Sequence, residues 1–510
     1  TFFTKNGERD VDKLRWVLDR HEQDIVRLND YLLSRLDDVV PVTTVMHDLD
    51  WSRYRVLSTL ETLVRDLETQ QTGGRDDDKY DMQGKVIKIN HSVQINTLAL
   101  EYQYRKRSIA WVLLLEMLTE QVDSYENFAD RHNISVAAVR SAKQKIQEAF
   151  LNQDIEVSKN NRIVGNEVVV RAFFMQLMRY YHAQIETTII QSTPQDHLVT
   201  DQLVDKLLDI YGLTQDMTNE RVISLQVLIW LIRVQNGHYL HDQDLPHILV
   251  DAADWPEAYQ QLNAHLIDMM REFVDLPEHV LRIEAQFAIL TMFTSGLVTD
   301  VPEEMLRSEV QTRLKRLTLT LRNNYETAFQ SQLPSVVEAQ LLQATLSSNL
   351  RTLYFLKDLV QSSVDIGVLE RNFPIHAKFT SDLLVTLADV WQIEDVPKFR
   401  RVMFEDYFNA IIVHLTPAMI LPPIRVAIGF VYHPGMDELI RQQLANRRNI
   451  NFEFVSVGEP ADFYISDIAI ESEYTVPGYI WNVFPDNHTI DHFVQDAMQL
   501  SIKYYQNRKR

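Results

Sequence analysis

The feature that most restricts the fold of this chain is a spacing of apolar, small and polar residues that occurs twice near its N-terminus. In both copies a pair of residues precedes a polar turn, and an apolar residue and a serine follow it. Two more apolar residues lie four and eleven residues after the serine, on one face of a helix. The first copy is Val45-Met46, Asp48-Leu49-Asp50, Trp51, Ser52, Val56 and Leu63, and the second is Phe128-Ala129, Arg131-His132-Asn133, Ile134, Ser135, Val139 and Ile146. Each copy therefore predicts a helix-turn-helix unit.

The serine of each copy is expected to be the N-cap of the second helix, because its hydroxyl can accept a free N–H of the first turn. Residues just after this cap face the major groove when such a unit binds DNA. In the first copy we predict DNA contacts by Ser52, Arg53, Tyr54 and Arg55. In the second copy we predict contacts by Ser135, base reading by Val136, Ala137, Arg140, Ser141 and Gln144, and phosphate contacts by Arg131, Lys143 and Lys145.

Each copy is followed by residues that alternate like a short β-hairpin, which predicts two winged helix-turn-helix modules. The expected strands are Lys85–Ile89 with Ser92–Ile95, and Ile155–Val157 with Arg162–Val164 across the turn Lys159–Asn161. A linking helix is expected over Arg105–Glu120. Ala129 suits the crossing of the two helices, whereas Met46 is bulkier than usual there, so the first copy fits less well. The alternative is a helical hairpin inside a larger core, but two copies with hairpins and basic second helices favour DNA binding.

The charge balance restricts how the chain can meet a nucleic acid. Its net charge of −21 over 510 residues argues against non-specific binding by the whole molecule. The field that matters is local, however, because salt screens charges beyond about 8–10 Å. Basic residues gather near the repeats, at Arg53 and Arg55, at Arg105-Lys106-Arg107, and at Arg131, Arg140, Lys143 and Lys145.

Other sequence features narrow the class of protein. There is no cysteine, which excludes disulfides and thiolate chemistry. No run reaches the roughly 18 apolar residues of a membrane span, and the first residues do not follow the pattern of a signal peptide, so a cytoplasmic location is expected. We find no Gly-rich phosphate loop and no His-Glu-x-x-His, and His238, His241 and His247 fit an exposed loop better than a metal site. No enzymatic activity and no cofactor are expected.

The rest of the chain divides into a helical middle and a different C-terminal part. Residues from Glu167 to about Ile420 have helical periodicity, with a division near Gly296–Pro302. After Pro422-Pro423 strands alternate with helices, which predicts a small parallel α/β domain. The expected strands are Arg425–Tyr432, Asn451–Val457, Ala461–Ile465 and Tyr479–Phe484, and the helices are Asp437–Arg447 and Ile490–Tyr505. The predicted fold is mainly α and multidomain, with boundaries at 1–97, 98–168, 169–298, 299–420 and 421–510.

The chain resembles the Mga-type transcriptional regulators of Gram-positive bacteria, which include the anthrax toxin activator, a virulence regulator. The resemblance lies in Phe128–Ile146, Ile163–Glu167 and Arg171–Phe174, and its most specific part is the run G-x-E-x-x-x-R-x-F. The order of parts also matches over nearly the whole chain. The resemblance implies a DNA-binding activator with two helical phosphotransferase regulation domains and a C-terminal domain like enzyme IIB of the sugar phosphotransferase system. It also implies binding to promoter DNA as a homodimer.

Phosphorylatable histidines in the regulation domains are a further implication of the resemblance. In the first domain Arg221 and Thr291 occupy the matching positions, and neither can become a phosphohistidine. In the second domain no histidine lies between His279 and His376, and only His414 fits a family position. His414 is thus the candidate phosphorylation site and the phosphocarrier of that system a candidate partner. The alternative for His414 is an ordinary core histidine.

The C-terminal resemblance carries one more implication. In enzyme IIB the loop after the first strand holds a phosphorylated cysteine, and here that loop is Tyr432–Met436. Without cysteine this phosphate transfer is impossible, so the domain is expected to serve dimerisation or docking, with His433 as an alternative acceptor. The alternative function for the whole chain is a phosphorelay-linked interaction protein that does not bind DNA.

Overall fold

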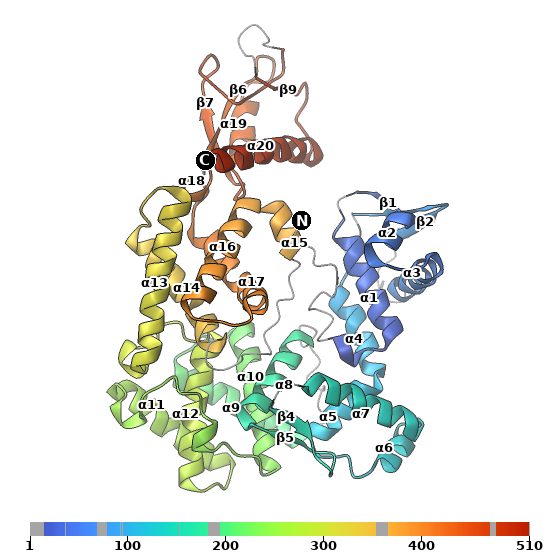
Figure 1. Cartoon of the computed structure of the whole chain (residues 1–510), viewed down its shortest axis with the longest axis vertical. Helices are drawn as coiled ribbons and strands as arrows, with labels where there is room; N and C mark the ends of the chain where they lie inside the picture. The colour runs from blue at the N-terminus through green and yellow to red at the C-terminus, as the bar shows by residue number, and fades with distance from the viewer. Residues whose placement is uncertain are drawn as a thin grey trace. The chain divides into compact units, whose positions relative to one another are not determined.

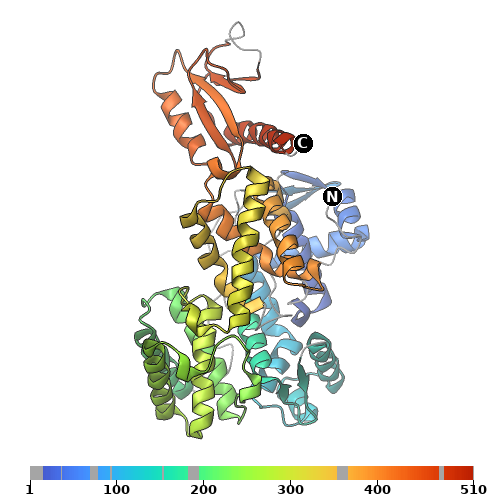
Figure 2. The ribbon, with the colours of Figure 1, turned by 60° about the vertical axis from the view of Figure 1, so that its left-hand side comes forward.

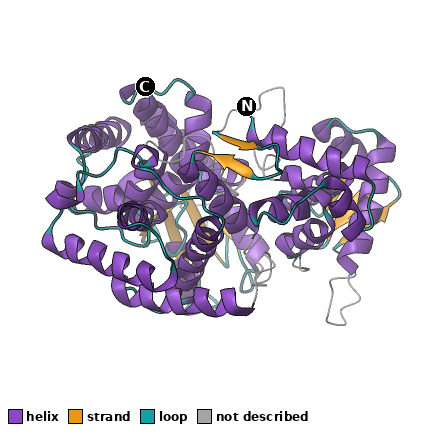
Figure 3. Cartoon of the chain, turned by 90° about the horizontal axis from the view of Figure 1, so that it is seen from below, coloured by secondary structure: helices purple, strands orange, loops and turns teal. Residues whose placement is uncertain are grey.

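The computed structural model describes residues 15–35, 37–68, 79–91, 93, 95–151, 154–181, 194–352, 366–469 and 476–508. Helices predominate, and strands occupy a few short segments, drawn orange in Figure 3. The chain separates into two compact units, Thr1–Arg307 with Leu350–Ser363, and Ser308–Asn349 with Val364–Arg510. The prediction of a mainly helical fold is confirmed, and the five predicted boundaries stay predictions. Within the described residues, no helix is both long and apolar enough to cross a membrane.

The first helix-turn-helix lies near the start of the first unit (Figure 1). Its elements are a 3-10 turn (Arg15–Val17), α1 (Arg20–Leu33), β1 (Val39–Pro41), α2 (Val42–Leu49), α3 (Arg53–Glu68), β2 (Tyr80–Gln83) and β3 (Val86–Ile89). The three strands form an antiparallel sheet in the order β1-β3-β2, and Gly84 turns the β2–β3 hairpin with a φ of 67°.

This hairpin corrects the wing predicted after the first repeat. Strand β3 matches the expected Lys85–Ile89, but its hairpin partner β2 precedes it, and Ser92–Ile95 is not the second strand. Ser92 and Gln94 lie outside the described residues, and Val93 and Ile95 are not in a strand. The physical reason is that β1 and β2 occupy both edges of β3, so no edge is left for a later segment to pair with.

The second module follows directly. Its elements are α4 (Thr97–Arg107), α5 (Ile109–Leu118), α6 (Tyr125–Arg131), α7 (Val136–Phe150), β4 (Ile155–Val157) and β5 (Ile163–Gly165). The predicted second wing is confirmed, with β4 and β5 antiparallel. The linking helix expected over Arg105–Glu120 is wrong, because Ser108 has an extended backbone and its hydroxyl accepts the N–H of Trp111 (3.3 Å), which ends α4 and starts α5.

Both modules share one hydrophobic core with part of the helical middle. The buried side chains run from Val17 through α8 (Glu167–Tyr181) and include Leu225, Ile229 and Ile232 of α10 (Met217–Gln235). The other helices of this unit are α9 (Pro194–Tyr211), α11 (Glu257–Phe273) and α12 (Glu278–Ser295). The modules are therefore packed on each other and on α10.

The second unit contains a helical part and the C-terminal sheet. The helices are α13 (Ser308–Phe329), α14 (Ser335–Leu350), α15 (Ile366–Asn372), α16 (Pro374–Val390), α17 (Val396–His414) and α18 (Pro417–Ile420). Strands β6 (Pro423–Gly429), β7 (Asn451–Val455), β8 (Phe463–Ser466) and β9 (Gly478–Ile480) are parallel, in the order β7-β6-β8-β9. Figure 2 shows α19 (Met436–Ala445) and α20 (Asn487–Arg508) beside these strands. The predicted parallel α/β arrangement is confirmed.

Candidate nucleic-acid interface

The two helix-turn-helix turns have the same backbone geometry. Asp50 and Asn133, each two residues before the capping serine, are in the left-handed region with φ of 56° and 54°. In each turn, the residue that follows the left-handed one donates its N–H to the carbonyl five residues earlier. These bonds are Trp51 N to Met46 O and Ile134 N to Ala129 O, both 3.0 Å. The repeated spacing thus produces the same fold twice, and Met46 is accommodated at its crossing.

Both serines cap their helices as predicted. The Ser52 hydroxyl accepts the N–H of Arg55, and the Ser135 hydroxyl accepts the N–H of Ala138, each at 3.2 Å. The caps fix where α3 and α7 begin, and so fix which residues form their first exposed turns. The N-cap predictions are confirmed, while contact of these residues with DNA stays a prediction.

Helix α7 presents one continuous exposed face. Ala137, Arg140, Ser141 and Gln144 are exposed, and their spacing places them on the same side of the helix. No ion pair engages the Arg140 guanidinium among the residues that the structure describes. Val136, in contrast, is half-buried and packs against the core, so its side chain supports the helix more than it faces solvent. Four of the five predicted base readers therefore lie together on an open surface.

The two lysines of α7 already have partners within the chain. The Lys145 ammonium lies 3.0 Å from Asp19, and that of Lys143 lies 5.0 Å from the centre of the Tyr125 ring. Both side chains are half-buried, and their charges lie beside the exposed face rather than on it. This position is compatible with phosphate contacts at the border of the interface.

Helix α3 differs at its third residue. Arg53 and Tyr54 are exposed, and Tyr54 has 81% of its surface open to solvent. Arg55 instead makes two hydrogen bonds to Asp24, at 2.6 and 2.8 Å, and lies over the Trp51 ring at 4.5 Å. Three of the four residues predicted to contact DNA in this copy, Ser52, Arg53 and Tyr54, are thus exposed, and Arg53 has no ion pair within the described residues.

In the basic run at 105–107, two of the three cations make contacts inside the protein, and Lys106 is exposed, with its ammonium 4.2 Å from the Tyr102 ring. Arg105 is 1% exposed and lies 4.9 Å from the Trp111 ring. Arg107 is exposed but pairs with Glu22 at 2.6 Å. Arg131, expected to meet phosphates, pairs with Glu116. The pairing of Arg107 with α1 and of Arg131 with α5 thus engages these two cations within the protein.

The second wing adds two basic residues that the sequence reasoning did not assign to the interface. Lys159 is exposed in the turn between β4 and β5, and Arg162 follows it with 53% of its side chain exposed. Arg162 is also 3.0 Å from Glu120. The Lys159–Arg162 segment carries cations at the tip of the hairpin that follows α7. Basic residues in a predicted wing turn could have indicated this part of the interface from the sequence.

The positions compared with the family's phosphorylatable histidines lie on four different helices. Arg221 is half-buried on α10, and Thr291 is buried on α12, where its hydroxyl donates to Ala288 O at 2.8 Å. His414 is the last residue of α17 and is half-buried. His376 on α16 is 1% exposed, and burial lowers its pKa to about 4, so it is neutral at ordinary pH. His414 is thus the more accessible of these two histidines.

The loop after β6 is organised by a buried carboxylate. Asp467, at the end of β8, accepts the N–H groups of Val431 and Tyr432 at 2.8 and 2.6 Å, and lies 3.2 Å from His433 Nδ1. Burial alone would raise the pKa of Asp467, but these bonds hold it below its ordinary value. Met436 is buried at the start of α19. In this loop, His433 is thus held beside a carboxylate, and Met436 is part of the core.

Comparison with known families supports the second module as a DNA-binding unit. Residues 93–178 match the family model described as the Mga helix-turn-helix domain. The match covers α4 to α7, the second wing and most of α8, and supports a DNA-binding transcription regulator of the Mga type. No match to a curated protein was found.

Proposed function

We propose that the chain regulates transcription by binding double-stranded DNA at promoters, with α7 as its principal recognition helix. One observation carries the proposal: the matched segment contains the helix whose exposed face gathers Ala137, Arg140, Ser141 and Gln144. An exposed helix of this kind fits the major groove, where arginine can bond to guanine and glutamine to adenine. The Arg140 guanidinium is the strongest base-reading group on this face.

The second wing and the first module extend this contact. Lys159 and Arg162 supply positive charge where a wing meets the DNA backbone. Arg53 and Tyr54 at the start of α3 supply a second recognition surface. The acidic balance of the chain does not oppose this binding, because charges more than about 10 Å from the DNA are screened in salt.

The regulatory part of the proposal rests on the resemblance to Mga-type regulators. The helical middle acts as two phosphotransferase regulation domains, and the C-terminal parallel sheet acts as an enzyme IIB-like docking or dimerisation domain. His414 is the acceptor for a phosphoryl group from the phosphocarrier, because it is half-buried at a helix end and not locked in the core. The chain works as a homodimeric activator in the cytoplasm, and we assign it no reaction and no cofactor of its own.

The DNA-binding proposal is tested with fluorescence anisotropy on a duplex enriched from a random-sequence pool by the unaltered chain. Arg140→Ala is expected to weaken binding by about 1–3 kcal/mol, the range for loss of a base contact. The matched control is Arg448→Ala, which removes an exposed arginine from the second unit and should leave the affinity unchanged. Equal losses in both variants, or no salt-dependent binding by the unaltered chain, would refute the assignment and favour an interaction protein without DNA function.

The regulatory proposal has its own test. The full chain is incubated with the phosphorylated phosphocarrier, and the site of label is located by mass spectrometry. Label is expected at His414 and absent in His414→Ala, with His376→Ala as a second control. Label elsewhere, or none, would remove the phosphorelay from the proposed function without affecting DNA binding.

A further inference from the structure

The run Gly165-x-Glu167-x-x-x-Arg171-x-Phe173 leads to a buried cluster of charges in the first unit. Glu167 and Arg171 on α8 meet Arg233 on α10 and Glu284 on α12. Each of these four side chains is at most 6% exposed. The bonds are Arg233 to both Glu167 oxygens (2.7 and 2.9 Å), Arg171 to Glu167 (2.9 Å), and Arg171 to both Glu284 oxygens (2.6 and 2.9 Å). Two cations and two carboxylates thus form a neutral chain linking three helices.

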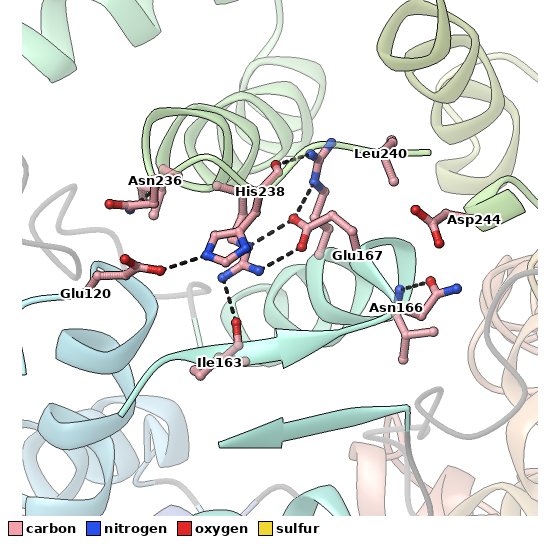
Figure 4. Close-up of polar contacts among 12 residues, drawn as sticks. Glu120, Ile163, Asn166, Glu167, Asn236, His238, Leu240 and Asp244 are labelled. Carbon is pink, nitrogen blue, oxygen red and sulfur yellow. Dashed lines mark hydrogen bonds and ion pairs between the residues drawn. The ribbon is translucent and has the colours of Figure 1, made fainter. Parts of the chain in front are cut away.

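Three of these side chains also bond to the backbone of the wing and of a neighbouring turn, and Figure 4 shows the bond that ends on the Ile163 carbonyl. Arg233 donates to the carbonyl of Ile163, which lies in wing strand β5, at 3.1 Å. Arg171 donates to the His238 carbonyl at 3.2 Å, and Glu284 accepts the N–H of Leu240 at 3.1 Å. One end of the cluster is therefore fixed to the wing and the other to the turn that follows α10.

A second connection runs outside this buried chain. Figure 4 shows Glu120, which follows α5, pointing to the ring of His238, with 2.7 Å between Oε1 and Nε2. The other oxygen of Glu120 lies 3.0 Å from Arg162 Nε. A cation of the wing and a histidine of the helical region thus share one carboxylate.

Gly165 lets the wing reach this position. A side chain there would place its Cβ 2.0 Å from the carbonyl oxygen of Asp154, the residue before β4. Its φ of 150° is also one that other residues rarely adopt. Asn166 then caps α8 through a bond from Val169 N at 3.2 Å, and Phe173 packs edge-on against Phe150 at the end of α7. Gly165, Glu167, Arg171 and Phe173 therefore all contribute to joining the second wing, α8 and α7.

Such a cluster is costly to build for stability alone, because burying charges offsets much of what their pairing gains. Burial by itself would raise the pKa of Glu167, but the bond from Arg233 and the charges of both arginines hold it below its ordinary value. Glu167 therefore stays charged, and the directional bonds of the cluster fix the relative placement of the elements they join.

We propose that Arg233 and Glu284, which belong to the helical region, are positioning residues that hold the second wing in register for DNA. Arg233 fixes β5, and Glu284 fixes Arg171 and the turn that carries His238. Movement of α10 or α12 therefore changes how Lys159 and Arg162 meet the DNA backbone. This inference rests on the proposed DNA-binding function.

The test is a double-mutant cycle between Arg233→Lys and Arg162→Ala in the full chain. Lysine keeps the charge but cannot bond to both Glu167 oxygens and the Ile163 carbonyl together. The measurement is the dependence of affinity on salt concentration, using a duplex enriched from a random-sequence pool by the unaltered chain. Arg162→Ala should reduce the slope of log K against log salt by about 0.9, the value for one phosphate contact. We expect Arg233→Lys to reduce it similarly and the double variant to lose no more.

Matched controls separate positioning from stability. Arg15→Lys makes the same change in a buried arginine of the first module, where Arg15 bonds to Glu101 and Asp30. It should leave the effect of Arg162→Ala intact. If the losses of Arg233→Lys and Arg162→Ala add, or if Arg233→Lys lowers only the thermal midpoint, the positioning role is refuted while DNA binding stands. If the unaltered chain does not bind DNA in a salt-dependent way, both proposals fall.

A second variant applies if Arg233→Lys does not fold. Glu120→Gln changes a residue at the edge of the cluster and should be tolerated. In this background Arg162→Ala should alter the salt slope less than it does in the unaltered chain, because Arg162 is no longer held in place. A larger effect would mean that Glu120 competes with DNA for Arg162, and would overturn the inference.

Discussion

The two winged modules share a backbone plan and differ in what their surfaces are bound to. Both have a left-handed residue in the turn, the same hydrogen bond across it and a serine cap. In the first module Arg55 on α3 is held by Asp24, whereas Arg140 on α7 is free of ion pairs within the described residues. The two modules therefore have the same backbone geometry but differ in which arginine is exposed without an ion pair. The difference arises because the contacts of each arginine depend on residues outside the helix-turn-helix.

The wings differ in a related way. In the first module β3 is flanked by two strands, so main-chain hydrogen bonds on both edges hold it. In the second module β5 pairs with one strand, and Arg233 from α10 bonds to its Ile163 carbonyl. The first wing is stabilised within its own sheet, and the second depends on the helical region. The second wing is therefore the one that can respond to that region.

The largest predicted effect comes from removing the central cation of the second module. Arg171→Met removes the arginine that pairs with Glu284 and one of the two arginines that pair with Glu167, and should lower the free energy of opening by about 3–5 kcal/mol. Arg15→Met in the first module should cost less, because only one of its two carboxylate partners, Glu101, is buried, whereas Asp30 is 28% exposed and can be solvated. Native-state hydrogen exchange of α8 and α1 amides measures both. An equal loss would contradict the stronger anchoring of the second module.

Replacing one glycine in each wing compares their packing. Gly165→Ala forces a Cβ into the Asp154 carbonyl and should destabilise the second wing by about 3 kcal/mol. Gly84→Ala in the first wing meets no atom within 4 Å and should cost about 1–2 kcal/mol, for its left-handed backbone alone. Hydrogen exchange of β5 and β3 amides measures the difference. Similar values would show that the second wing relaxes around the added methyl group.

The caps should behave alike in the two modules. Ser135→Ala and Ser52→Ala each remove one hydrogen bond to a first-turn N–H, and each should cost about 1 kcal/mol. Protection of the Ala138 and Arg55 amides reports the two losses separately. If only one of the two amides lost protection, the two serine caps would not be equivalent.

The smallest effect concerns the held arginine of the first module. Asp24→Asn weakens a pair whose arginine side chain is 46% exposed, and such surface pairs are worth about 0.2–1 kcal/mol. Freed from Asp24, Arg55 should increase DNA affinity slightly and steepen its salt dependence. The change should vanish when Asp24→Asn is combined with Arg55→Ala. An increase that persists in the double variant would arise from the lost negative charge rather than from Arg55.

Sequence predicted the parts of the fold that depend on near neighbours. The caps at Ser52 and Ser135, the second wing and the parallel C-terminal strands follow from signals within a few residues of one another. The first wing was assigned wrongly because apolar alternation at Ser92–Ile95 carries no information about which strand edges are occupied. The helix break at Ser108 was missed for a similar reason, since a serine can cap one helix or lie within a longer one.

The sequence by itself determined a mainly helical chain with a helix-turn-helix domain and a parallel C-terminal sheet, because periodicity and capping act over short distances along the chain. Only the tertiary structure decided which charges are available. Arg105 became a core residue and Arg55 a partner of Asp24, while Arg171 reached Glu284 across 113 positions. Which partner a charged side chain finds depends on the neighbours that packing brings to it rather than on sequence order.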